Sequence, residues 1–161
     1  MTTTLPPAAS RHFEDYPVGA VFELSGFALS EDDIVAFAAR YDPQSMHVDR
    51  VWAAQGPFGG VIASGWHTLA ALMRLIVENY LPQNGLASPG VDELRWLLPV
   101  RPDEMLRVRA TITQARRSRS RPDRGLVTGF VEVLNEAGDP VLTMRPMNFV
   151  RCRPESLASS G

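Results

Sequence analysis

The sequence contains no lysine, because all sixteen of its positively charged residues are arginine. Chemistry that needs a lysine, such as Schiff-base formation or the lysine of a phosphate-binding loop, is therefore excluded. Cys152 is the only cysteine, which excludes an intrachain disulfide and a cysteine-based metal site and favours a reducing, cytoplasmic location. A net charge of −2 gives no support to nucleic-acid binding, which leaves a basic footprint.

Long uninterrupted apolar runs are also missing. The first ten residues lack the basic start and apolar core of a secretory signal. Polar residues interrupt the most apolar stretch, residues 59–81, well short of the ~20 residues that span a bilayer, so we expect no membrane partner. The length of 161 residues fits one domain. We predict a flexible N-terminal tail over residues 1–10, a single domain over residues 11–153 and a C-terminal tail over residues 154–161.

The stretch 59–81 predicts one long central helix. Apolar residues repeat along it at helical spacing and cover most of its circumference, so we expect the rest of the chain to wrap it. The residues that carry this pattern are Leu69, Leu72, Met73, Ile76 and Tyr80.

Two shorter helices are predicted before it. Ser30 is placed to cap the first, which should bury Ile34, Phe37, Ala38 and Tyr41 and end at Asp42, because Pro43 disfavours helical geometry there. Residues 48–55 predict the second, with Val51 and Trp52 facing inward.

Strands dominate the rest of the chain. One is expected just after Pro17-Val18-Gly19 and four after the long helix, the first of these with Leu94, Trp96 and Leu98 on one face. Residues 135–140 have the composition of a hairpin turn between the last two strands. This order predicts an α+β fold in which one curved antiparallel sheet wraps one long helix and leaves edges available for pairing.

A run of arginines lies between two of the predicted strands, at residues 116–124. Such runs are usually solvated loops. The alternative is a contact with the phosphates of a nucleotide-bearing ligand such as coenzyme A.

Asp42 and His47 carry the most informative chemistry. An acid and an imidazole at the ends of a short polar loop can act on one water as general acid and base. The N–H groups at the start of the long helix, near Gly65, can hold a developing oxyanion. The alternative is structural, with Asp42 ending a helix and His47 acting as a cap or satisfied core residue.

The segments 41–47 (YDPQSMH) and 58–65 (FGGVIASG) resemble the hydratase motif of the MaoC-like dehydratases, which include the (R)-specific enoyl-CoA hydratases and have the hot-dog fold. The resemblance implies that Asp42 and His47 activate water and that Gly65 binds the thioester oxygen, with Ser64 and Gly60 also near the substrate. It implies an acyl-CoA or related thioester substrate, no metal or redox cofactor, and a homodimer or higher homo-oligomer.

Three functions follow from these features. The preferred one is an acyl-CoA hydratase/dehydratase that adds water to a 2-enoyl thioester or removes it from a 3-hydroxyacyl thioester. A hot-dog thioesterase is the second, although the Asp-x4-His spacing argues against it. A non-catalytic acyl-thioester-binding subunit is the third. Acyl chain length and the carrier, coenzyme A or acyl-carrier protein, stay open.

Overall fold

The computed structural model describes residues 6–83 and 85–154. In this part of the chain, the first half contains two 3-10 turns, a strand and four helices: η1 (Ala8–Ser10), η2 (Phe13–Asp15), β1 (Val21–Phe27), α1 (Glu31–Tyr41), α2 (Ser45–Val48), α3 (Arg50–Gln55) and α4 (Gly65–Asn79). The second half contains four strands: β2 (Gly90–Trp96), β3 (Leu106–Arg117), β4 (Arg124–Leu134) and β5 (Pro140–Arg151).

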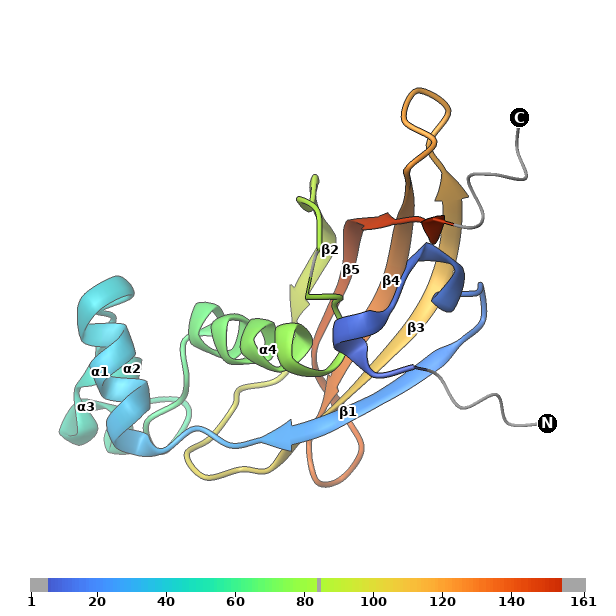
Figure 1. The fold of residues 1–161 in the computed structure, drawn as a ribbon. Helices are drawn as coiled ribbons and strands as arrows, with labels where there is room; N and C mark the ends of the chain where they lie inside the picture. The colour runs from blue at the N-terminus through green and yellow to red at the C-terminus, as the bar shows by residue number, and fades with distance from the viewer. Residues whose placement is uncertain (1–5, 84, 155–161) are drawn as a thin grey trace.

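The strands form one antiparallel sheet in the order β1-β3-β4-β5-β2. Figure 1 shows the sheet curving beside α4, while α1, α2 and α3 project as a group beyond the start of that helix. The chain leaves α4 for the far edge of the sheet, so β2 pairs only with β5 and forms one edge. This arrangement confirms the predicted α+β class and hot-dog fold.

The core lies between the sheet and α4. Alternate residues of β3 are buried, Leu106, Val108, Ala110 and Ile112 among them, as the sequence predicted. β4 alternates in the same way. The helix meets them with Leu72, Leu75 and Ile76 on its inner face. Each such side chain contributes about 1.5–3 kcal/mol when fully buried, so this interface holds α4 in place against the sheet.

Both ends of α4 are fixed by specific hydrogen bonds. Ser64 is its N-cap and accepts a hydrogen bond from the Trp66 N–H. At the other end, the Arg11 guanidinium donates to the carbonyls of Asn79 and Tyr80 at 3.1 and 3.2 Å. A cation at a helix C-terminus satisfies carbonyls that have no partner within the helix. The start of the helix is therefore held at a defined place in the fold.

The predicted first helix is confirmed as α1, with Ser30 as its N-cap and Asp42 as its C-cap. Ile34 and Ala38 are buried as predicted. The prediction that Tyr41 is buried is wrong, because this side chain is 63% exposed. The second predicted helix, residues 48–55, is α3, which begins after its N-cap Asp49, and the short helix α2 that precedes it was not predicted. The inward residue of α3 is Ala53, whereas Val51 and Trp52 point outward, contrary to the prediction.

One face of α4 is open, although the sequence predicted a wrapped helix. Trp66, Met73 and Val77 are 56, 47 and 57% exposed. Trp96 at the end of the neighbouring edge strand and Leu98 beyond it are also exposed, so only Leu94 of the predicted face packs against the core. The physical reason is that β2 is an edge strand, so within the described chain these side chains are covered only in part, for example where Trp66 and Trp96 contact each other.

Part of the predicted N-terminal tail has structure. Residues 8–10 form η1, and the Ala9 carbonyl accepts a hydrogen bond from the Gln83 N–H at 3.4 Å. The predictions for residues 1–5 and 155–161 lie outside the described residues. Within the described ranges, no helix has both the length and the hydropathy needed to cross a bilayer.

Candidate active site

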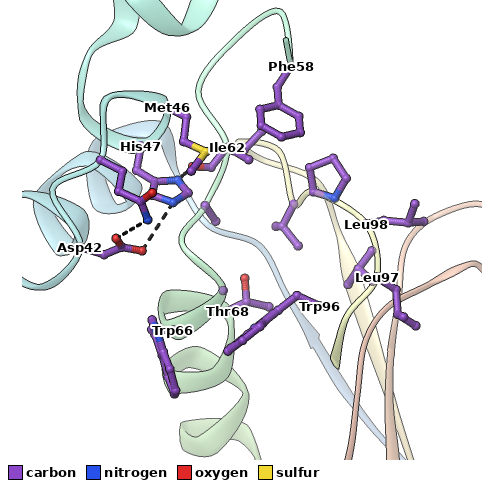
Figure 2. Close-up of a pocket in the computed structure, with 16 residues that line it drawn as sticks. Asp42, Met46, His47, Phe58, Ile62, Trp66, Thr68, Trp96, Leu97 and Leu98 are labelled. Atoms are coloured by element: carbon purple, nitrogen blue, oxygen red, sulfur yellow. Dashed lines mark hydrogen bonds and ion pairs between the residues drawn. The ribbon is translucent and has the colours of Figure 1, made fainter. Parts of the chain in front are cut away.

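A cavity of about 440 Å³ lies at the N-terminus of α4. Its lining comes from the loop that starts at Asp42, the segment 58–63 before α4, the first turn of α4, residues 96–100 at and after the end of β2, and Val141 of β5. Figure 2 shows Asp42 and His47 on one side, with Trp66, Thr68 and Trp96 around the first turn of the helix. Most of the remaining lining is apolar, including Met46, Phe58, Leu97, Leu98 and Val100.

Asp42 is the C-cap of α1, and its carboxylate accepts two side-chain hydrogen bonds. The Ser64 hydroxyl donates to Oδ2 at 2.6 Å, and the Gln44 amide donates to Oδ1 at 2.7 Å. These hydrogen bonds, the one from Ser64 first, hold the pKa of Asp42 below its ordinary value. The carboxylate is therefore ionised at neutral pH and stays fixed in orientation.

His47 lies in α2 and is 5% exposed. Its Nδ1 lies 2.7 Å from the Ile62 carbonyl, and since a carbonyl only accepts, Nδ1 must carry a hydrogen. This fixes the tautomer of the neutral ring and leaves Nε2 as the basic atom. Nε2 lies 3.5 Å from Asp42 Oδ2, which makes the two side chains a pair facing one cavity.

Gly65 is the first residue of α4, where an N–H has no partner within the helix. Among the described residues, none accepts a hydrogen bond from it. Gly65 also lines the cavity, so the positive end of the helix dipole faces the same space as Asp42 and His47. The structure therefore brings together at one cavity the three residues that the sequence singled out, Asp42, His47 and Gly65.

Ser64 and Gly60 are placed differently from the predicted substrate contacts. Ser64 is 0% exposed, and its hydroxyl is directed at Asp42. Gly60 is not among the residues that line this cavity. Beside it, Gly59 has φ +67°, a conformation that favours glycine, so this pair shapes the turn that leads into α4.

Sequence reasoning missed three residues of the site. Gln44 follows the acid by two positions, and its polar side chain in a short loop was a signal that could have been used. Thr68 is buried one turn into α4. Trp96 was predicted only to share one face of a strand with Leu94 and Leu98, and nothing in its own segment indicates that it reaches the start of the long helix.

His67 is adjacent to the site without lining the cavity. Its ring stacks on Phe37 at 4.5 Å, and its buried Nδ1 has no hydrogen-bond partner among the residues that the structure describes. Burial lowers the pKa of this imidazole. A neutral ring packed between α1 and α4 fits a structural role.

The arginine run lies at the opposite end of the sheet from this cavity. Arg124 pairs with Arg151 at the end of β5, whereas Val141 at its start lines the cavity. Val141 and Arg151 are ten positions apart along β5, or roughly 30 Å. Two of the arginines form ion pairs, Arg117 with Glu14 and Arg124 with Asp123. Within a single chain the run is therefore far from this cavity, and its contact with the phosphates of a ligand stays a prediction.

The chain is similar to known proteins in sequence and in fold. The family model described as a MaoC-like domain matches residues 14–133. A crystal structure of the MaoC-like dehydratase from Rhodospirillum rubrum has a TM-score of 0.83 and 39% identity, covering 90% of this chain and 99% of its own. The uncharacterized protein YdeM of Bacillus subtilis is 32% identical over 76% of this chain and 86% of its own. The 3-hydroxyacyl-thioester dehydratase Z of Mycobacterium tuberculosis is 41% identical over 52% of this chain and 56% of its own.

Proposed function

The chain belongs to the MaoC-like hydratase/dehydratase family, and from this premise we propose that it adds water to a 2-enoyl thioester or removes it from a 3-hydroxyacyl thioester. The observation that carries the proposal is the Asp42–His47 pair, 3.5 Å apart, facing the same cavity as the unpaired N–H of Gly65. A thioesterase needs the oxyanion donor but does not need this pair to protonate carbon.

The reaction requires two proton transfers at neighbouring carbons. As the water oxygen bonds to C3, its proton passes to one member of the pair, and the C2–C3 electron pair moves toward the carbonyl to form an enolate. The other member then delivers a proton to C2. Asp42, ionised, accepts a proton, and His47 supplies one from Nε2 when its ring is protonated, so the pair needs one shared proton.

The Gly65 N–H stabilises the enolate oxygen in this proposal. The partial positive charge at the start of α4 favours the negative charge that develops on the thioester carbonyl. Since the helix is fixed at both ends, the donor does not have to reorganise during the reaction. No metal or redox cofactor takes part in the proposed chemistry.

An apolar cavity of about 370 Å³ adjoins the first one and supports an acyl substrate. Trp66 lines both cavities. The second runs along α4 past Leu69, Met73 and Ile76, with Val91 and Met144 opposite. The hydrocarbon part of an acyl group suits this lining. It has no polar atoms, so burying it there leaves no polar group without water or a hydrogen bond.

We also propose that two copies assemble through the open face of α4 and the edge strand β2. This surface carries exposed Trp66, Met73, Val77 and Val91. An apolar edge strand without a partner favours pairing with another strand. Pairing of β2 with its copy would extend the sheet and cover the outer side of the apolar cavity.

The test is turnover of a panel of enoyl-CoAs, from crotonyl-CoA upward in chain length. Loss of the enoyl-thioester absorbance without release of free thiol supports the proposal. Release of thiol in proportion to substrate consumed would favour a thioesterase instead. Binding of these substrates with neither change would favour a non-catalytic acyl-binding subunit.

A further inference from the structure

Trp96 is the last residue of β2, and its backbone is fixed where the strand ends. It pairs with Leu142 of β5, and the next residue, Leu97, donates its N–H to the Val141 carbonyl at 2.8 Å. The side chain lines the catalytic cavity together with Gly65. Pairing with β5 thus holds the large Trp96 side chain beside the first residue of α4.

The indole of Trp96 rests directly on Gly65. A Cβ atom built on residue 65 would lie 2.5 Å from Cε2 and 2.6 Å from Cδ1 of the indole, and nearer still to Nε1. Real Cβ atoms do not approach other atoms so closely. Trp66 supports the other side of the ring, with centroids 5.1 Å apart and planes at 69°. Glycine at position 65 is therefore required by the position of the Trp96 ring.

This contact brings two N–H donors close together. From standard bond lengths, the Gly65 nitrogen and Trp96 Nε1 are no more than roughly 5 Å apart. Neither donates to any acceptor that the structure describes. An oxygen that accepts a hydrogen bond from each, at about 2.7–3.1 Å, fits between two donors at that separation. A carbonyl oxygen has the two lone pairs that this requires.

We propose that the indole N–H of Trp96 is a second hydrogen-bond donor to the thioester oxygen, beside the N–H of Gly65. The assignment rests on the proposed hydratase function. An indole N–H only donates, so it adds no charge and no proton that competes with Asp42 and His47. It strengthens its hydrogen bond as the carbonyl becomes an enolate, which makes it a contributor to the rate rather than to ground-state binding.

The experiment compares Trp96→Phe with the wild type in steady-state hydration of crotonyl-CoA. Phenylalanine keeps an aromatic ring and removes the N–H, so kcat should fall by about 10–10²-fold. The dissociation constant of butyryl-CoA, which forms no enolate, should change little. Trp52→Phe is the matched control, because Trp52 lies on α3 and does not line the cavity; its kcat should equal that of the wild type.

A second variant separates the N–H from the shape of the ring. Incorporation of 3-benzothienylalanine at residue 96 replaces the N–H by sulfur and keeps the size of the side chain, so it should fold like the wild type and lose kcat like Trp96→Phe. Wild-type kcat in either variant would overturn the assignment. So would an equal loss in kcat/KM and in butyryl-CoA affinity with kcat unchanged. A wild type inactive on every enoyl-CoA would instead overturn the hydratase function itself, and this assignment with it.

Discussion

Replacing Ser64 with alanine removes the hydroxyl that joins Asp42 to the first turn of α4. This hydroxyl is fully buried, donates to Asp42 Oδ2 at 2.6 Å and accepts from the Trp66 N–H at 3.3 Å. Loss of an N-cap costs about 0.5–2 kcal/mol. Loss of a hydrogen bond to a charged group costs about 1.5–3 kcal/mol. We therefore expect Ser64→Ala to lower the free energy of unfolding at pH 7 by about 2–4 kcal/mol, measured by urea denaturation.

Ser30 offers a matched control. Its hydroxyl accepts from the Asp33 N–H at 3.1 Å and donates to Asp33 Oδ2 at 2.6 Å, the same two kinds of hydrogen bond, at an exposed site. Water replaces both partners after Ser30→Ala, so the loss should be about 0.5–1 kcal/mol, near the low end for a cap. Equal destabilisation by the two substitutions would refute the reasoning that the buried link between Ser64 and Asp42 carries most of the effect.

The pH dependence gives a second check on the same variant. The pKa of Asp42 is lowered from its ordinary value of 3.8, first by the Ser64 hydroxyl and then by the Gln44 amide. A lowered folded-state pKa stabilises the protein above the unfolded value, and this contribution is lost as the pH falls through the folded value. The difference between wild type and Ser64→Ala should therefore be largest at neutral pH and shrink below about pH 4. A constant difference down to pH 3 would contradict this account.

One further substitution tests the site, and one measurement of molecular mass tests the assembly. Gly65→Val places a branched side chain against Trp96 and where the thioester oxygen is proposed to bind. Turnover of crotonyl-CoA should therefore fall by at least about 10²-fold. The far-ultraviolet circular dichroism spectrum should stay that of the wild type. Undiminished hydration in that variant would show that the oxyanion assignment is wrong. Light scattering should give the mass of a dimer or a multiple of it at micromolar protein, because β2 and one face of α4 leave apolar side chains exposed in a single chain. A monomer mass would count against an acyl site completed by a second copy.

Local signals in the sequence predicted much of the fold. Ser30 and Pro43 fix the ends of α1, and alternation along Leu106, Val108, Ala110 and Ile112 identifies a half-buried strand, because these features act over a few residues. The same reasoning failed where burial depends on the position of an element in the sheet. Trp96 and Leu98 have the spacing of inward residues, yet β2 is an edge and leaves them exposed.

In the site, too, the sequence indicated the residues that lie in local motifs and missed the contacts that depend on the fold. Asp42, His47 and Gly65 were singled out because they lie in two short segments that resemble a known motif, and the structure places all three at one cavity. The role of Ser64 depends on a contact across 22 positions of the chain, and Trp96 meets Gly65 only because the sheet brings the end of β2 to the start of α4. Neither contact follows from a local pattern.

The most direct test of the central claim is turnover per folded molecule in Asp42→Asn, His47→Gln and the double variant. Both substitutions keep size and part of the hydrogen bonding while removing proton transfer, so each should lower kcat for enoyl-CoA hydration by about 10²–10⁴-fold. Because the two side chains act as a unit, the double variant should lose little more than the worse single one. Wild-type turnover in the single variants, with only a lowered melting temperature, would contradict the assignment of this pair as the acid and base of a hydratase.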